Sequence, residues 1–305
     1  MSTTHPHPDS LAGVTCVLVT PFRDRVGAVD AAALEQLVHR VDAAGVQAIT
    51  ALGNTAEVFQ LSEPERRTVL EAVAGATEQA TLITGVTGPL TEAVALTELA
   101  AGHGYAAAML HDPPDPLAGE RGLVRLLHDF ADRSALPTVL YLRTARLGAP
   151  ALAEVVAHPR IVAVKYARPD VGVLAGLLAQ PETRDACTWI CGLAESMVLP
   201  MRGPGVVGFT SGVANVRPDL ALAVWRASRD GDYAALAGHV APLLAIERMR
   251  TRDGGRHNVA VLKAALALHG LDAGDVRPPC EPLGAAETAE LRAALDALPV
   301  AAVAH

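Results

Sequence analysis

The sequence has very little lysine, few cysteines and no stretch of dense positive charge. Of its 305 residues, 25 are basic and 33 are acidic, which gives a net charge of -8 at pH 7. No window is basic enough to neutralise a run of phosphates, so we expect neither nucleic acid nor an anionic membrane surface as a partner. Apolar runs stay short of the 18 or so residues that a membrane span requires. A small-molecule ligand is the expected partner.

Cysteine usage and the N-terminal segment both favour a reducing compartment. The four cysteines, Cys16, Cys187, Cys191 and Cys280, are too scattered for a disulfide scaffold, and no two of them form a Cys-X-X-Cys metal motif. Residues 1–9 lack the basic start and apolar core of a signal peptide. The sequence therefore predicts a cytoplasmic protein with ordinary buried thiols.

Apolar residues are abundant and are arranged in alternating segments. They make up 50% of the chain, which is enough to fill a sizeable core. Short, continuous apolar runs predict eight strands, at 14–22, 46–52, 81–86, 105–110, 136–142, 161–166, 187–191 and 206–210. Helical patterns lie between them, among others at 31–44, 64–78, 91–103 and 123–133. Eight strand–helix units predict an α/β fold, a (β/α)8 TIM barrel, with an open doubly wound sheet as the alternative.

Further helical patterns follow the eighth expected strand, at 220–229, 233–250, 259–268 and 285–298. The first completes the barrel, and the other three are expected to form a C-terminal helical appendage. We therefore predict a disordered N-terminal tail over residues 1–12, a barrel over 13–230, and a C-terminal helical extension over 231–305 that packs on the barrel.

Lys165 ends the sixth expected strand, where the chemistry of such barrels is built. A charged lysine is costly at the end of an apolar strand, so burial should lower its pKa and leave a nucleophilic amine. The only other lysine is Lys263, and the remaining 23 basic residues are arginines. The two lysines suit positions where an amine must lose its proton. The alternative is a structural lysine paired with a carboxylate such as Glu57.

Tyr141 ends the fifth expected strand, next to the strand of Lys165. Its hydroxyl is placed to reach a ligand joined to Lys165, although it could equally be an ordinary barrel aromatic. The loop 53–57 contains Asn54 and Thr55 and leads into a helix. Its backbone N–H groups and hydroxyl suit a carboxylate or a phosphate.

Other polar groups at strand ends give weaker signals. Thr210 ends the eighth expected strand and is a candidate for substrate binding. Arg143 and Arg146 follow the fifth strand, and either binds a second acidic group or forms a surface ion pair. His111 and Asp112 suggest a metal, but no second cluster of ligands accompanies them, so we expect no metal site.

Six segments, in order, resemble the dihydrodipicolinate synthase / N-acetylneuraminate lyase family of class I aldolase-type barrels. The resemblance runs from about Gly13 to Leu298. The segments are Thr20-Pro21-Phe22; Gly53 to Glu57 with Leu61-Ser62; Leu136-Pro137 with Tyr141; Val162 to Lys165; Gly208 to Asn215; and Arg277-Pro278-Pro279 with Pro282-Leu283.

The resemblance implies a mechanism. Lys165 would form an imine with pyruvate or another 2-oxo acid, and the imine would stabilise the carbanion that follows as an enamine. The loop at Asn54 and Thr55 would hold the carboxylate of the 2-oxo acid, and Tyr141 would transfer protons. No metal or organic cofactor would be needed. The relatives also imply a homo-dimer or homo-tetramer.

Several residues depart from the family pattern. Asn54 stands where the family has a proton-relaying threonine, Ala56 replaces a glycine, and Leu142 replaces an asparagine. Residues 112–116 replace a PYY segment and contain no tyrosine, while Arg146 falls where a substrate-binding arginine is expected. An amide cannot pass a proton as a hydroxyl does. Two alternatives to the lysine-pathway reaction therefore remain: a 2-oxo-3-deoxy sugar-acid dehydratase or aldolase, and a catalytically silent barrel that binds a 2-oxo acid.

Overall fold

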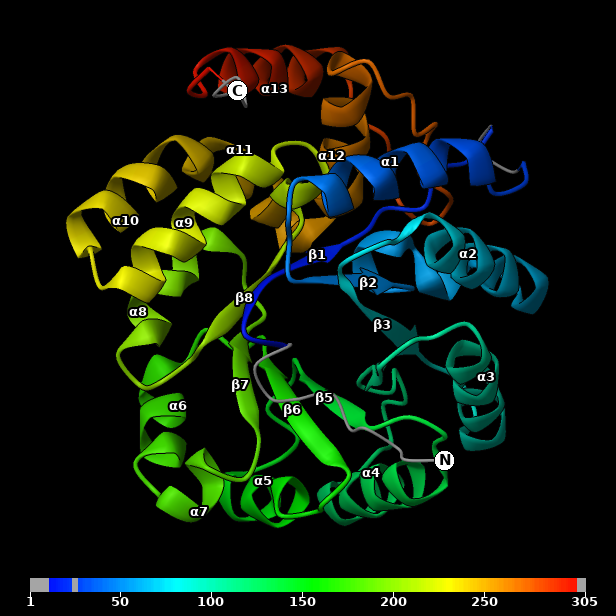
Figure 1. The fold of residues 1–305 in the computed structure, drawn as a ribbon, viewed down its shortest axis with the longest axis vertical. Helices are drawn as coiled ribbons and strands as arrows, with labels where there is room; N and C mark the ends of the chain where they lie inside the picture. Colours follow the sequence, from blue (N-terminus) through cyan, green and yellow to red (C-terminus); the bar gives the residue numbers. More distant parts are fainter. Residues whose placement is uncertain (1–10, 24–26, 301–305) are drawn as a thin grey trace.

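The structure is a computed structural model that describes residues 11–23 and 27–300. Its centre is a closed barrel of eight parallel strands that pair in chain order (Figure 1). The strands are β1 (Gly13–Val17), β2 (Ala48–Ala51), β3 (Thr81–Val86), β4 (Ala107–Leu110), β5 (Thr138–Leu142), β6 (Ile161–Tyr166), β7 (Thr188–Cys191) and β8 (Gly208–Ser211). The predicted (β/α)8 barrel is confirmed, and the doubly wound alternative is wrong, because β1 pairs with β8.

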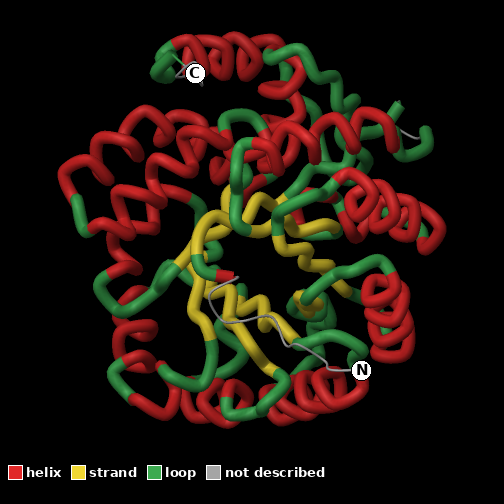
Figure 2. Tube along the Cα trace, viewed as in Figure 1, coloured by secondary structure: helices red, strands yellow, loops and turns green. Residues whose placement is uncertain are grey.

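Helices form a ring outside the strands, as Figure 2 shows. Those that follow the strands are α1 (Ala31–Ala43), α2 (Glu63–Ala76), α3 (Leu90–Gly102), α4 (Glu120–Arg133), α5 (Ala149–Val156), α6 (Val171–Leu178), α7 (Pro181–Arg184), α8 (Val198–Arg202) and α9 (Pro218–Asp230). The C-terminal part adds α10 (Tyr233–Val240), α11 (Leu244–Thr251), α12 (Asn258–Leu268) and α13 (Ala285–Asp296). None of the helices in the described part of the chain is long and apolar enough to cross a membrane.

The segment 233–250, expected as one helix, is in fact two. Helix α10 ends at Val240, a 3-10 turn covers Ala241–Leu243, and α11 begins at Leu244. Pro242 lies in that turn, and proline can neither donate the helical hydrogen bond nor avoid the carbonyl four residues earlier. The break matters because it sets the direction of α11, which reaches the mouth of the barrel.

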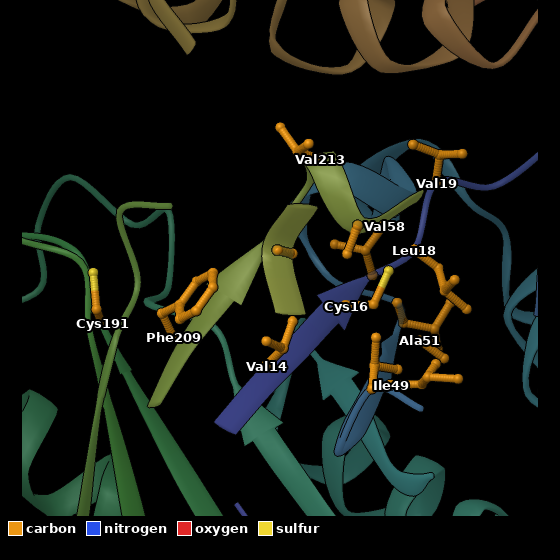
Figure 3. Close-up of a cluster of buried hydrophobic side chains, with 14 of the residues drawn as sticks. Val14, Cys16, Leu18, Val19, Ile49, Ala51, Val58, Cys191, Phe209 and Val213 are labelled. Carbon is orange, nitrogen blue, oxygen red and sulfur yellow. The ribbon is translucent and has the colours of Figure 1, made fainter. Parts of the chain in front are cut away.

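Strand residues alternate between an outer and an inner apolar layer. The outer layer lies between strands and helices, and Figure 3 shows part of it around Val14, Cys16, Ile49 and Phe209. The inner layer fills the barrel with mostly small side chains, and Leu11 belongs to it with 2% of its surface exposed. Of the predicted disordered tail 1–12, residues 1–10 lie outside the described residues.

The same alternation fixes the direction of the polar side chains on the strands. Val139, Tyr141 and Ala163 belong to the inner layer, whereas Leu140 and Val164 belong to the outer one. Lys165, two residues after Ala163, therefore points into the barrel at its C-terminal end. The alternation thus places Tyr141 and Lys165 in the same inner layer.

The C-terminal part is held to the barrel by buried charge pairs. Lys263 on α12 pairs with Glu57 at 2.7 Å, and both side chains are almost completely buried. Lys263 Nζ also donates to the carbonyl of Asp275 at 2.9 Å. The backbone N–H of Arg277 donates to Glu57 Oε2 at 2.7 Å, and the Arg277 guanidinium binds Glu65. These contacts fix α12 and the segment after it against the loop that follows β2.

Glu65 also starts helix α2. The Ser62 N–H donates to Glu65 Oε2 at 2.8 Å in a capping box, with Pro64 in the first turn. The hydrogen bond from Arg277 lowers the pKa of Glu65 to about 2, so the carboxylate stays ionised. One side chain therefore caps a helix and anchors the C-terminal segment.

Candidate active site

The C-terminal ends of the strands open into a cavity of about 640 Å³. Its walls come from strand ends, from the loops that follow them, and from α11 and α12. Six of the seven residues nominated from the sequence line it: Lys165, Tyr141, Asn54, Thr55, Arg143 and Thr210. Residues more than 150 positions apart in the sequence are thus brought to one site.

Lys165 lies at the wall of this cavity with only 4% of its surface exposed. Burial lowers the pKa of Lys165 to about 7, Cys191 opposes the shift, and the charges of Arg143 and Arg250 add to it. A large fraction of the side chain is therefore the neutral, nucleophilic amine at neutral pH. Gly192 makes room for it, because a Cβ at that position would lie 3.0 Å from Lys165 Cγ.

Glu57, the suggested structural partner of Lys165, is bound elsewhere. Its carboxylate pairs with Lys263 at 2.7 Å. Among the described residues, no carboxylate lies within ion-pair distance of Lys165. The two lysines of the sequence thus have different environments: Lys263 is paired with a carboxylate, and Lys165 is desolvated beside a cavity.

Tyr141 lies beside Lys165. The two residues are register partners on β5 and β6, and Lys165 Nζ lies 4.2 Å from the centroid of the Tyr141 ring. Asn54 Nδ2 donates to Tyr141 Oη at 3.0 Å. Burial raises the pKa of Tyr141, so its phenol is protonated at neutral pH. The hydroxyl can therefore give a proton to a group forming on Lys165, and it accepts a hydrogen bond from an amide where the family has a hydroxyl.

His111 also contacts the Tyr141 ring. The two rings meet edge to face, with centroids 5.5 Å apart. His111 is 3% exposed, and its Nε2 lies 3.1 Å from the carbonyl oxygen of Leu52. Burial lowers the pKa of His111 to about 4, so the ring is neutral at neutral pH. No group of three potential metal ligands occurs within residues 11–23 and 27–300.

The loop after β2 is fixed to the end of β1. Thr55 Oγ1 donates to the carbonyls of Val17 and Leu18, at 2.8 and 3.0 Å. Thr20 Oγ1 donates to the carbonyl of Ala56 at 2.8 Å. The hydroxyl proton of Thr55 is therefore directed at the backbone. The loop faces the cavity with the Asn54 amide and with the start of the 3-10 turn Asn54–Ala56.

The two arginines after β5 have different environments. Arg146 forms an ion pair with Asp112 and donates to the carbonyls of Pro113 and Asp115, at 2.6 and 2.9 Å. It lines a separate, small pocket and not the large cavity. Arg143 is exposed and lines the large cavity. Of the two, Arg143 is the one placed to meet a second acidic group of a ligand.

A further polar cluster, which the strand ends and motifs did not indicate, lies at the same cavity. Glu195 follows β7 and is completely buried, while Glu247 and Arg250 come from α11, each 7% exposed. Glu247 and Arg250 line the cavity. Strand-end reasoning could not find them, because α11 lies outside the eight strand–helix units. Glu247 and Arg250 lie in a stretch rich in charged residues, 247–253, and nothing in that stretch distinguishes the buried side chains from the exposed ones.

Comparison with known proteins gives the same family that the motifs indicate. The family model described as "Dihydrodipicolinate synthetase family" matches residues 10–298. A 4-hydroxy-tetrahydrodipicolinate synthase of Exiguobacterium sp. is 31% identical over 293 residues, covering 93% of this chain and 97% of the relative. A probable 5-dehydro-4-deoxyglucarate dehydratase of Methylobacterium radiotolerans is 32% identical over 291 residues, covering 92% and 93%.

Solved structures agree with these sequence relatives. The crystal structure of dihydrodipicolinate synthase from Oceanobacillus iheyensis is similar with a TM-score of 0.91 and 26% identity, covering 95% of this chain and 97% of that one. The match thus includes the C-terminal helices as well as the barrel. The chain belongs to the dihydrodipicolinate synthetase family and is a lyase of the Schiff-base-forming, class I aldolase type.

Proposed function

We propose that Lys165 forms an imine with pyruvate or another 2-oxo acid, and that Tyr141 transfers the protons of this reaction. The observation that carries the proposal is the environment of Lys165, a buried amine at the cavity wall whose pKa is lowered to about 7. Such an amine attacks a ketone without first having to lose a proton to solvent. The neighbouring Tyr141 phenol supplies the proton that the departing carbinolamine oxygen needs.

The imine supplies the electron sink that this chemistry requires. Once it has formed, the C3 proton or a bond from C3 to the next carbon can break, and the electrons are held as an enamine. We therefore propose that the reaction uses no metal and no organic cofactor. Asn54 and the backbone at Thr55 are proposed to hold the carboxylate of the 2-oxo acid, because they face the cavity from the loop after β2.

The part of the substrate beyond C3 is proposed to be a sugar-acid chain. Dehydration of a 2-oxo-3-deoxy sugar acid is favoured over the lysine-pathway condensation, because Asn54 lacks the hydroxyl through which the condensation relays a proton. The relative named as a probable 5-dehydro-4-deoxyglucarate dehydratase supports the same choice. Arg143 and Thr210 are proposed to contact the part of the substrate beyond C3.

We further propose a homo-dimer or homo-tetramer in the cytoplasm. The proposed assembly rests on the family, and sedimentation analysis tests it. The proposed compartment rests on the thiols, because Cys16, Cys187, Cys191 and Cys280 are all free.

A substrate panel tests the reaction. The protein is incubated with 2-oxo-3-deoxygluconate, with 5-dehydro-4-deoxyglucarate, and with pyruvate plus an aldehyde. Loss of water, release of pyruvate and carbon–carbon bond formation are then followed by NMR. Turnover of one of these substrates supports the lyase. Saturable binding of a 2-oxo acid without turnover would instead indicate a silent, ligand-binding barrel.

A further inference from the structure

We propose that Glu247 is a further catalytic residue, which donates a proton to the oxygen on C4 of an imine-bound 2-oxo-3-deoxy sugar acid so that this oxygen leaves as water. The inference rests on the imine chemistry proposed above for Lys165. It is carried by the position of Glu247 in the cavity and by a second buried carboxyl, Glu195, in the same cluster.

Glu247 reaches the cavity from outside the strand–helix units. It lies on α11, and its side chain lines the same cavity as Lys165 and Tyr141 while only 7% of its surface is exposed. The N–H of Ser196 donates to Glu247 Oε1 at 3.0 Å. This bond fixes the carboxyl against the 3-10 turn that follows β7. Tyr141 is on β5, so the two side chains enter the cavity from different elements of the fold.

The buried environment of Glu195 favours a protonated carboxyl in this cluster. It is completely buried, its Oε1 accepts a short hydrogen bond from the Ser211 hydroxyl, and its Oε2 has no hydrogen-bond partner among the described residues. Burial and the charge of Glu247 raise the pKa of Glu195, and burial raises the pKa of Glu247 as well. Two neighbouring buried carboxyls resist double ionisation, which favours one retained proton on the pair.

The charge of Arg250, beside Glu195 and Glu247, fits one proton retained on the two carboxyls. Arg250 is buried in the same cluster and donates to Asn258 Oδ1 at 3.0 Å. It fits there because Gly212 has no side chain, since a Cβ would lie 2.4 Å from Arg250 Nη2. Cys191 interacts electrostatically with Glu195 and Glu247, and Lys165 interacts electrostatically with Arg250. One guanidinium, two carboxyls and one proton form a neutral unit, which burial favours.

The proposed step needs an acid that reaches the oxygen on C4. Tyr141 gives its proton to the carbinolamine oxygen, which leaves as water, and the resulting phenolate takes the C3 proton of the imine. The enamine electrons then form the C3–C4 double bond while the C4–O bond breaks. Hydroxide is a poor leaving group, so the proton of Glu247 passes to that oxygen. A water molecule departs, and a conjugated imine remains on Lys165.

Borohydride trapping with two probes tests the step, because the mass of the adduct reports how far the reaction has gone. The wild-type protein, Glu247→Gln and Glu98→Gln are each mixed with pyruvate or with 2-oxo-3-deoxygluconate, reduced at short times, and measured as intact proteins. Gln at 247 still accepts the Ser196 hydrogen bond but carries no acidic proton. Glu98 is an exposed carboxylate on α3 and provides the matched control.

We expect the wild-type protein and Glu98→Gln to accumulate a sugar-acid adduct lighter by one water. Glu247→Gln should keep the intact sugar-acid adduct and lose water about 10²-fold more slowly or worse, while its pyruvate adduct forms normally. Loss of water at the wild-type rate in Glu247→Gln overturns the inference. So does a wild-type adduct that stays intact or is cleaved to pyruvate. Absence of every adduct from the wild-type protein overturns the proposed function itself.

Discussion

Lys165 and Tyr141 are register partners on adjacent strands, with the Nζ atom of the lysine 4.2 Å from the centroid of the tyrosine ring. Both side chains are more than nine-tenths buried, and both face the large cavity. The arrangement places a neutral amine next to a protonated phenol. It explains how one small site can provide both a nucleophile and an acid.

Removing the Tyr141 hydroxyl should slow turnover while still allowing some imine to form. We expect Tyr141→Phe to slow turnover by about 10²-fold or more, because among the described residues no other tyrosine lines the cavity to protonate the carbinolamine. The ring still packs against Lys165 and His111, so the fold should persist. Steady-state rates together with borohydride trapping measure the two effects. An unchanged rate would remove Tyr141 from the mechanism.

The reaction with pyruvate should depend on pH through Lys165. Its pKa is lowered to about 7 from the ordinary 10.5, so the neutral amine predominates above about pH 7. The rate of imine formation should therefore rise with pH up to about 7 and level off above it. Stopped-flow mixing followed by trapping gives this profile. A rate that keeps rising toward pH 10 would show that Lys165 is an ordinary, charged lysine.

The two arginines after β5 should have separable effects. Arg143→Ala should weaken binding of 2-oxoglutarate about 10-fold more than binding of pyruvate, because Arg143 faces the cavity and can pair with a second carboxylate. Arg146→Ala should leave both affinities unchanged and lower stability by about 1 to 2 kcal/mol, because it loses its bonds to the 112–115 loop. The reverse pattern would assign the second acidic group to Arg146.

The second lysine should matter for stability. Lys263→Met would leave the Glu57 carboxylate buried without its partner, which we expect to cost about 3 to 5 kcal/mol in the free energy of unfolding. The double variant Lys263→Met/Glu57→Gln should recover much of that loss. Denaturant unfolding measures both variants. Equal stability of wild type and Lys263→Met would show that the pair does not anchor the C-terminal helices.

Much of the barrel was predictable because its strands are short, continuous apolar runs, whereas the segments between them have helical periodicity. The sixth strand was predicted with its observed bounds, and the alternation of inner and outer residues placed Lys165 and Tyr141 in the cavity. The first strand was predicted too long. The chain after Val17 is held by other partners, such as the Asn215 side chain on the N–H of Val19, and the strand ladder does not include it.

The rest of the site could not be read from local patterns. Glu195 and Glu247 are 52 positions apart, and only the docking of α11 on the barrel brings them together. The position of Arg146 against Asp112 likewise depends on the path of two loops. Residue spacing predicts which side chains end a strand, but it does not predict which loops and helices fold back over the strand ends.

The most direct test of the account is borohydride reduction of the purified protein with pyruvate, followed by peptide mass spectrometry. We predict a pyruvate-sized adduct on the peptide that contains Lys165 and none on the peptide that contains Lys263. Lys165→Arg should abolish the adduct and keep the fold, because arginine remains protonated. An adduct that persists in Lys165→Arg, or its absence from the wild-type protein with every 2-oxo acid tried, would contradict the central claim.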